Sequence, residues 1–205
     1  SAWKSALVEP HAALSLAEDD LGLAAARLYG DYEQALRAYQ AVDFDDLIRL
    51  PVRLFESEAD VLLRWQGKLQ YLLVDEYQDT NRSQYRLLRL LAGDRAAFTA
   101  VGDDDQAIYA WRGADVENLR VLQADFPQLK VIKLEQNYRS MQRILKAANA
   151  LIGNNPKLFD KRLWSEHGHG DAVQVNVARD NEQEAEQVVM KLMAHRFEHR
   201  GKWGD

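Results

Sequence analysis

Two adjacent carboxylates, Asp75 and Glu76, follow directly after the apolar run Tyr71 to Val74. The large and β-branched residues of this run predict a strand that is buried on both faces, as strands of parallel sheets are. Ligands gather at the carboxyl ends of such strands, where Mg²⁺ usually takes one or two carboxylates and keeps several waters. Asp75 therefore suits a magnesium ion, directly or through water, and Glu76 suits the orientation of an attacking water. The alternative is that both acids merely cap the next helix.

A second polar cluster, Gly102 to Gln106, follows the apolar run Ala96 to Val101. Because parallel strands end at the same edge of a sheet, we expect this cluster to lie one loop away from Asp75. Gln106 has a neutral amide that both donates and accepts hydrogen bonds, so it suits a sensor of a terminal phosphate. The cluster is therefore predicted to relay the state of a phosphate site to the residues that follow it.

The residues after this cluster combine two aromatic rings and a cation: Tyr109, Trp111 and Arg112. Aromatic faces stack on bases and a neighbouring cation holds a backbone phosphate, so the three residues predict contact with nucleic acid. A single tryptophan more often packs in a core. Trp111 stands in a loop without hydrophobic periodicity, which favours the binding interpretation.

A third cluster, Gln136 to Arg139, follows the apolar run Lys130 to Leu134, which we predict to be a third strand. The planar guanidinium of Arg139 fits a phosphate bidentately and can stabilise charge in phosphoryl transfer, and Tyr138 offers a flat ring beside it. A salt bridge from Arg139 to one of the many acids is the structural alternative. Three such clusters on one sheet edge would together make a site.

Hydrophobic spacing predicts helices first and an alternation of strands and helices afterwards. Helices are expected over the first forty or so positions, after Asp43 as an N-cap, and from about 56 to 65, with Pro51 breaking or restarting the second. Later elements are helices at 81–91, 116–126, 141–152 (capped by Ser140) and 182–197, and a strand at 173–177. This order indicates an α/β fold in which helices flank a parallel sheet.

Composition narrows the function classes. The chain has 205 residues, 47% of them hydrophobic, and a net charge of -6, so nucleic-acid contact must come from a local basic patch. The absence of cysteine excludes disulfides, thiolate zinc sites and cysteine nucleophiles, and the five histidines show no metal-ligand spacing. No apolar run approaches the roughly 20 residues of a membrane span and no signal pattern opens the chain. We therefore expect a cytoplasmic protein without a membrane partner.

The run Leu73 to Asn81, the loop Val101 to Ala114 and the run Leu134 to Ser140 closely resemble motifs II, III and IV of superfamily 1A (UvrD/Rep/PcrA-like) DNA helicases. The segment Asp43 to Leu47 is also similar to part of this family, so the resemblance covers nearly all of the chain. It implies a RecA-like fold of the P-loop NTPase type, with ATP and Mg²⁺ as cofactors. It also implies movement from 3′ to 5′ on single-stranded DNA and unwinding of partially duplex DNA, in replication or repair with their proteins as possible partners.

The resemblance further implies a role for each matching residue. Asp75 would hold magnesium, Glu76 would act as the base for water, and Gln106 would touch the γ-phosphate. Arg139 would reach that phosphate from a second RecA-like domain, and Tyr138 would stack on adenine. Contacts with single-stranded DNA are implied for three residues of the second motif: Tyr109, Trp111 and Arg112.

The resemblance also implies three parts: the end of an inserted helical subdomain at 1–26, a partial first RecA-like domain at 27–135, and the start of a second at 136–205. No Gly-x-x-x-x-Gly-Lys-Ser/Thr loop occurs, because Gly67-Lys68 and Gly201-Lys202 lack both the earlier glycine and the hydroxyl residue. We therefore expect an internal piece of a helicase that does not turn over ATP alone.

Three other readings of the same residues remain open. One is a nucleic-acid-binding module in which the acids are structural. Another is a metallonuclease, since two-metal sites also need clustered acids, here Asp75, Glu76, Asp79 and Asp103 to Asp105. The last keeps the helicase fold within a helicase-nuclease subunit of a recombination complex.

Overall fold

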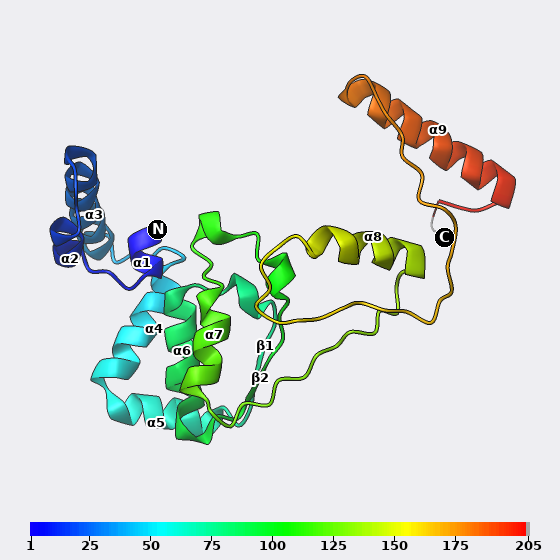
Figure 1. Cartoon of the computed structure of the whole chain (residues 1–205). Helices are drawn as coiled ribbons and strands as arrows, with labels where there is room; N and C mark the ends of the chain where they lie inside the picture. The colour runs from blue at the N-terminus through cyan, green and yellow to red at the C-terminus, as the bar shows by residue number, and fades with distance from the viewer. Residues whose placement is uncertain (204–205) are drawn as a thin grey trace. The chain divides into compact units, whose positions relative to one another are not determined.

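The computed structural model describes residues 1–203, and its internal contacts divide the chain into two compact units (Figure 1). The first unit contains residues 1–134 and takes back residues 155–161, whereas the second contains residues 135–154 and the chain from Arg162 onward. The finer division into helicase subdomains stays a prediction.

The first unit opens with five helices: α1 (Ala2–Ser5), α2 (Pro10–Ser15), α3 (Asp20–Ala38), α4 (Asp46–Ser57) and α5 (Ala59–Lys68). The prediction that Pro51 breaks or restarts a helix is wrong, because α4 runs through it. A proline removes one helical hydrogen bond. Val52 and Phe55 are buried after it, and α4 packs along α6 (Arg82–Ala92), so tertiary contact stabilises the second half of α4.

The first unit contains one parallel pair of strands among the described residues. β1 (Leu72–Val74) and β2 (Phe98–Ala100) pair in the register Leu72 to Phe98 and Val74 to Ala100. Beyond the last pair, the Val101 amide donates to the Val74 carbonyl at 2.8 Å. The expected α/β class is confirmed at this level, and the two carboxyl ends point to the same edge, as parallel strands require.

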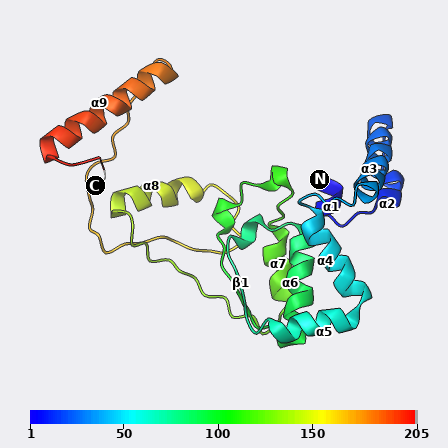
Figure 2. The same cartoon turned by 180° about the vertical axis from the view of Figure 1, so that it is seen from behind.

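Helices α6 and α7 (Glu117–Asp125) lie beside this strand pair, as Figures 1 and 2 show from opposite sides. The core between them is one buried cluster: Tyr77, Tyr85, Leu88, Ala92, Phe98 and Leu122. A reciprocal capping box of Asn81 and Gln84 starts α6 at the predicted place. Single 3₁₀ turns follow the strands and helices: η1 (Tyr77–Asp79), η2 (Gly93–Arg95), η3 (Asp104–Gln106) and η4 (Ala110–Arg112). The core thus fixes the strands after which the loops with Asp75, Glu76 and Gln106 begin.

The second unit contains α8 (Gln142–Ile152) and α9 (Asn181–His199), close to the predicted helices. Met141 is the N-cap of α8, so the prediction of Ser140 as its cap is wrong, because the Ser140 amide is held by Asn137 Oδ1 at 2.7 Å. The strands expected at 130–134 and 173–177 are also wrong. A strand needs a hydrogen-bonded neighbour, and the described backbone gives neither stretch one.

In the second unit, the one isolated bridge among residues 1–203 joins Gln136 to Trp164. The Asn137 amide donates to the Trp164 carbonyl at 2.7 Å, and the Trp164 amide donates to the Glu135 carbonyl at 3.0 Å. This bridge fixes the backbone just before Tyr138 and Arg139. Within the described part of the chain, no helix is both long and apolar enough to cross a membrane.

Candidate functional site

Asp75 and Glu76 leave the end of β1 as exposed carboxylates. The Glu76 amide donates to Asp75 Oδ1 at 3.0 Å, and Glu76 adopts the left-handed conformation with φ 48° and ψ 45°. That conformation is uncommon for a side chain with a Cβ and costs on the order of 1 kcal/mol or more. The helix-capping alternative is wrong, because Asn81 caps α6 and neither acid caps η1 with its side chain. Both carboxylates are therefore available to a ligand.

Gln78 connects the two loops, a role that the sequence did not reveal. Its buried amide donates from Nε2 to Glu76 Oε2 at 2.9 Å, while its Oε1 accepts the Asp103 amide at 3.0 Å. Gly102 makes this approach possible, since a Cβ there would lie 2.9 Å from Gln78 Oε1. The sequence offered one signal for this role, a side-chain amide two positions after Glu76, but the neighbouring acids have a more obvious chemistry.

Gln106 lies at the end of this hydrogen-bonded series. Its Nε2 donates to Asp103 Oδ2 at 2.7 Å, and the residue is exposed at the end of η3. The series therefore runs from Glu76 through Gln78 and Asp103 to Gln106, across the carboxyl ends of β1 and β2. The structure brings three predicted residues, Asp75, Glu76 and Gln106, to one edge of the sheet.

Asp103, Asp104 and Asp105 form the one group of three acids within residues 1–203 whose ligand oxygens lie within 4.8 Å of one another. Lys161 occupies the position of a cation: its Nζ contacts all three carboxylates, with Asp105 Oδ2 at 3.1 Å. Burial acts to raise the pKa of Asp103 and Asp104, but hydrogen bonds from Lys161 outweigh it and hold both below their ordinary value. Acids that are already neutralised in this way argue against the metallonuclease reading.

Tyr109, Trp111 and Arg112 form a compact exposed group around η4. The Arg112 guanidinium carbon lies 5.6 Å from the Tyr109 ring centroid and 5.8 Å from that of Trp111, within cation-π range. Trp111 is 80% exposed, so the core-packing alternative for it is wrong. Two ring faces and a charge are thus presented together to solvent.

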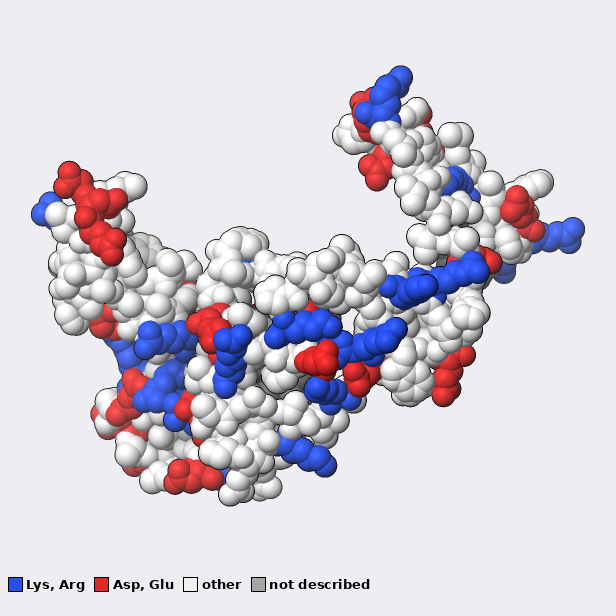
Figure 3. All heavy atoms as spheres, viewed as in Figure 1, with Lys and Arg blue, Asp and Glu red and all other residues white. Residues whose placement is uncertain are grey.

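Phe44 is a further candidate for the nucleic-acid interface, and the sequence analysis did not select it. It is 91% exposed, precedes α4, and lines the same hollow of about 490 Å³ as Trp111 and Arg112. An exposed phenylalanine next to an exposed tryptophan suits base stacking. On the face drawn in Figure 3, acidic and basic side chains of the first unit are interspersed, so nucleic-acid contact would depend on this local group.

Tyr138 and Arg139 lie in the second unit and are both exposed. The Tyr138 hydroxyl donates to Gln136 Oε1 at 3.0 Å, and Asn137 Oδ1 accepts the Arg139 amide at 2.9 Å. In the described part of the chain the Arg139 guanidinium has no carboxylate partner, so the salt-bridge alternative finds no support there. Their predicted contacts with the nucleotide stay predictions.

A second acidic group in the first unit, Asp43, Asp45 and Asp46, makes structural contacts. Asp45 Oδ1 accepts from the Ser5 hydroxyl at 3.3 Å, and Asp43 and Asp46 bind each other. The two residues exchange hydrogen bonds, from the Asp46 amide to Asp43 Oδ1 at 2.9 Å and from the Asp43 amide to Asp46 Oδ2 at 3.3 Å. Lys4 Nζ lies 2.7 Å from Asp43, 2.9 Å from Asp46 and 2.6 Å from Glu33, and Arg49 binds Glu33 and Asp46. The prediction of Asp43 as an N-cap is wrong, because α4 begins at Asp46 with Asp45 at the N-cap position and no side-chain cap hydrogen bond. Asp43 and Asp46 instead tie helices together through Lys4 and Arg49.

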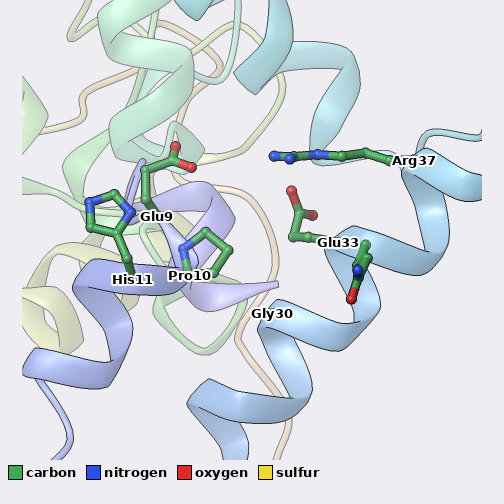
Figure 4. Close-up of a pocket in the computed structure, with 7 residues that line it drawn as sticks. Glu9, Pro10, His11, Gly30, Glu33 and Arg37 are labelled. Atoms are coloured by element: carbon green, nitrogen blue, oxygen red, sulfur yellow. The ribbon is translucent and has the colours of Figure 1, made fainter.

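Next to this group, α2 and α3 border an open hollow of about 390 Å³ (Figure 4). The carboxylates of Glu9 and Glu33 and the guanidinium of Arg37 turn toward it, with His11 and Gly30 at its sides. Glu33 already binds Lys4 and Arg49, and Glu9 pairs with Arg53. The hollow contains none of the residues predicted to do chemistry, and its acids are paired.

Sequence comparison with known proteins identifies the same type of helicase as the motifs. Residues 1–127 match the UvrD/REP helicase N-terminal domain, and residues 132–204 match the UvrD-like helicase C-terminal domain. The whole chain is 54% identical to ATP-dependent DNA helicase Rep of Escherichia coli and 53% identical to that of Salmonella typhimurium. Over 94% of its length it is 44% identical to ATP-dependent DNA helicase PcrA of Staphylococcus epidermidis.

The chain spans about 30% of the length of the two Rep proteins and 26% of that of PcrA. Its identity to Rep of Escherichia coli, 54% over the whole chain, exceeds its identity to this PcrA, 44% over 94% of the chain. Two domain families of one helicase type account for nearly the whole sequence, in the order in which the two structural units begin. The chain belongs to the UvrD/Rep helicase family.

Proposed function

We propose that this chain forms part of an ATP-dependent DNA helicase that couples ATP hydrolysis to movement along single-stranded DNA. The observation that carries the proposal is the hydrogen-bonded series from Glu76 through Gln78 and Asp103 to Gln106. Gln106 is followed within the same loop by the exposed group Tyr109, Trp111 and Arg112. A change at one end of this loop can therefore be transmitted to the other over a few residues.

The nucleotide end of the proposal uses oxygen ligands and a base. Asp75 would hold Mg²⁺, because its exposed carboxylate uses one acceptor site on the Glu76 amide and keeps others for a hard cation. When bound, the ion supplies neutralisation of phosphate charge. Glu76 would orient and deprotonate the attacking water, and the Gln78 amide fixes the direction of its carboxylate. Gln106 would sense the γ-phosphate with its amide.

The parallel pair of strands flanked by α6 and α7 supports assignment of this unit to the RecA-like fold. In the second unit, Arg139 would stabilise charge on the transferred phosphate, and Tyr138 would stack on adenine. The exposure of both side chains and the absence of an ion pair for Arg139 within the described residues support these roles.

At the DNA end, Trp111 and Phe44 would stack on bases while Arg112 holds a phosphate of the strand. We propose movement from 3′ to 5′ and unwinding of partially duplex DNA in replication or repair. We also propose a cytoplasmic location, because a chain without cysteine needs no oxidising compartment for disulfides and ATP is supplied in the cytoplasm.

The test uses the full-length protein in two assays, DNA-stimulated Mg²⁺-ATP hydrolysis and unwinding of a partial duplex with a 3′ single-stranded tail. Asp75→Asn should abolish both activities, whereas Asp60→Asn, at an exposed acid in α5, should leave both unchanged. Hydrolysis that survives both Asp75→Asn and Glu76→Gln would instead identify a binding module.

The nuclease readings are tested in the same reactions by following the integrity of the DNA strands. Divalent-dependent cutting without ATP would point to a metallonuclease. Cutting that accompanies ATP-dependent unwinding would point to a helicase-nuclease subunit. The pairing of Asp103, Asp104 and Asp105 with Lys161 leads us to expect no cutting without ATP.

A further inference from the structure

Residues 155–161 return to the first unit and fasten the loop that contains Gln106. Asp104 Oδ2 accepts the amides of Leu158 at 3.2 Å and of Phe159 at 3.3 Å. Lys161 then places its ammonium among the carboxylates of Asp103, Asp104 and Asp105. The contact spans 58 positions of sequence from Asp103, so it exists only in the folded chain.

The Asp103 carboxylate is the shared element of this contact and of the proposed phosphate sensor. Its Oδ1 accepts from Lys161 Nζ and from the Asp105 amide at 3.2 Å, and its Oδ2 accepts Gln106 Nε2 at 2.7 Å. The backbone of the same residue is held by Gln78 at 3.0 Å. Fixed at both its amide and its carboxylate, Asp103 sets the position and orientation of the Gln106 amide.

Charge gives Lys161 a second effect. Three carboxylates whose oxygens lie within 4.8 Å repel one another, and without a cation this repulsion would displace Asp103 and the Gln106 amide that it holds. Only one side chain in the described chain, Lys161, offers a cation to all three. Burial acts to lower the pKa of Lys161, but hydrogen bonds to the three aspartates outweigh it and raise the value, so the ammonium stays charged.

We propose that Lys161 is a positioning residue for ATP hydrolysis, which offsets the charge of the aspartate loop and so holds Gln106 in place through Asp103. This inference rests on the proposed function, since it deepens the role of Gln106. Lys161 does not touch the nucleotide in this scheme. Its loss should therefore affect turnover more than substrate binding.

The test measures steady-state ATP hydrolysis by the full-length protein on saturating single-stranded DNA. Lys161→Met, which removes the charge and keeps the length, should lower kcat by about 10- to 100-fold and change KM for ATP by less than about 3-fold. Lys161→Arg, which keeps the charge, should recover most of kcat. The matched control is Lys130→Met at an exposed lysine of the first unit that has no ion pair within residues 1–203, and it should behave as the parent.

A double-mutant cycle with Gln106→Ala separates positioning from a merely structural effect. If Lys161 acts through Gln106, the Lys161→Met and Gln106→Ala double variant should be no slower than Gln106→Ala alone. Losses that multiply, or a kcat of Lys161→Met within about 2-fold of the parent while Gln106→Ala is impaired, would overturn the inference and leave the proposed function intact. Full activity of Gln106→Ala would remove the proposed sensor itself, and with it the role of Lys161.

Discussion

The acids around Asp46 and the acids after β1 are the same kind of residue in opposite surroundings. Asp46 is 3% exposed and lies between Lys4 and Arg49, which are each 2% exposed. Asp75 and Glu76 are exposed, and among residues 1–203 they take hydrogen bonds only from two amides, the Glu76 backbone N–H and the side chain of Gln78. Buried charges must be paired, so the first group is committed to stability. Exposed carboxylates at the end of a strand stay free for a ligand.

The aspartate loop with Lys161 lies between these two extremes. Its acids are partly buried and paired with one lysine, yet Asp103 also holds the exposed amide of Gln106. Availability to solvent, more than the presence of adjacent acids, separates a structural group from a candidate catalytic group. The following predictions test that separation, from the largest expected effect to the smallest.

Glu76→Gln should lower kcat for ATP hydrolysis in the full-length protein by about 10²- to 10⁴-fold, the usual contribution of a general base. Because Glu76 is exposed, the free energy of unfolding of the protein should change by less than about 0.5 kcal/mol. Steady-state kinetics and urea unfolding measure the two quantities. A large loss of stability with little loss of turnover would place Glu76 with the structural acids.

Arg49→Met should reduce the free energy of unfolding by about 3 to 5 kcal/mol, because Glu33 and Asp46 would keep buried charges without this partner. The control is Arg86→Met, which removes a surface pair with Glu56 at 2.6 Å and should cost less than about 1 kcal/mol. Urea unfolding monitored by circular dichroism gives both values. Equal effects for the two arginines would contradict the distinction between buried and exposed pairs.

Trp111→Ala should weaken binding of single-stranded DNA by about 1 to 3 kcal/mol, the usual loss for a stacked base. The matched control is Trp65→Ala, which removes another exposed tryptophan, with Lys68 5.1 Å from its ring centroid in α5. Fluorescence anisotropy with a labelled oligonucleotide measures the affinities. Unchanged binding by Trp111→Ala, or an equal loss in the control, would remove Trp111 from the DNA site.

Low pH should reduce the free energy of unfolding, because protonation of Asp43 weakens its ion pair with Lys4. Burial acts to raise the pKa of Asp43, but hydrogen bonds from Lys4, the Asp46 amide and Tyr32 hold it below its ordinary value. Its contribution is therefore complete above the unfolded value of about 4 and is lost as pH falls through the lower folded value. The free energy of unfolding should fall less steeply below about pH 4 in Asp43→Asn than in the parent. An identical acid slope in both, measured by urea titrations at several pH values, would contradict the lowered pKa.

Much of the local structure was predictable because its cause is local. Apolar runs before Asp75 and Gly102 predicted the places of β1 and β2, but the predicted burial of the first run on both faces was wrong, because Leu73 is 81% exposed. The capping box of Asn81 and Gln84 starts α6 where the periodicity begins. The expected strand at 130–134 did not form, since a strand depends on a neighbour that periodicity does not specify. Pro51 was read as a break because the packing of α4 that overrides it is not visible in the sequence.

The sequence by itself determined which residues are chemically able to act: the acids after β1, the amide of Gln106, and the aromatic group around Trp111. The tertiary structure decided which of them are free and what holds them. It buried Asp46 between Lys4 and Arg49, exposed Phe44, and brought Lys161 to Asp103 across 58 positions. The physical reason is that side-chain chemistry and helical or strand periodicity are local properties. Burial and ion pairing depend on which distant segments meet when the chain folds.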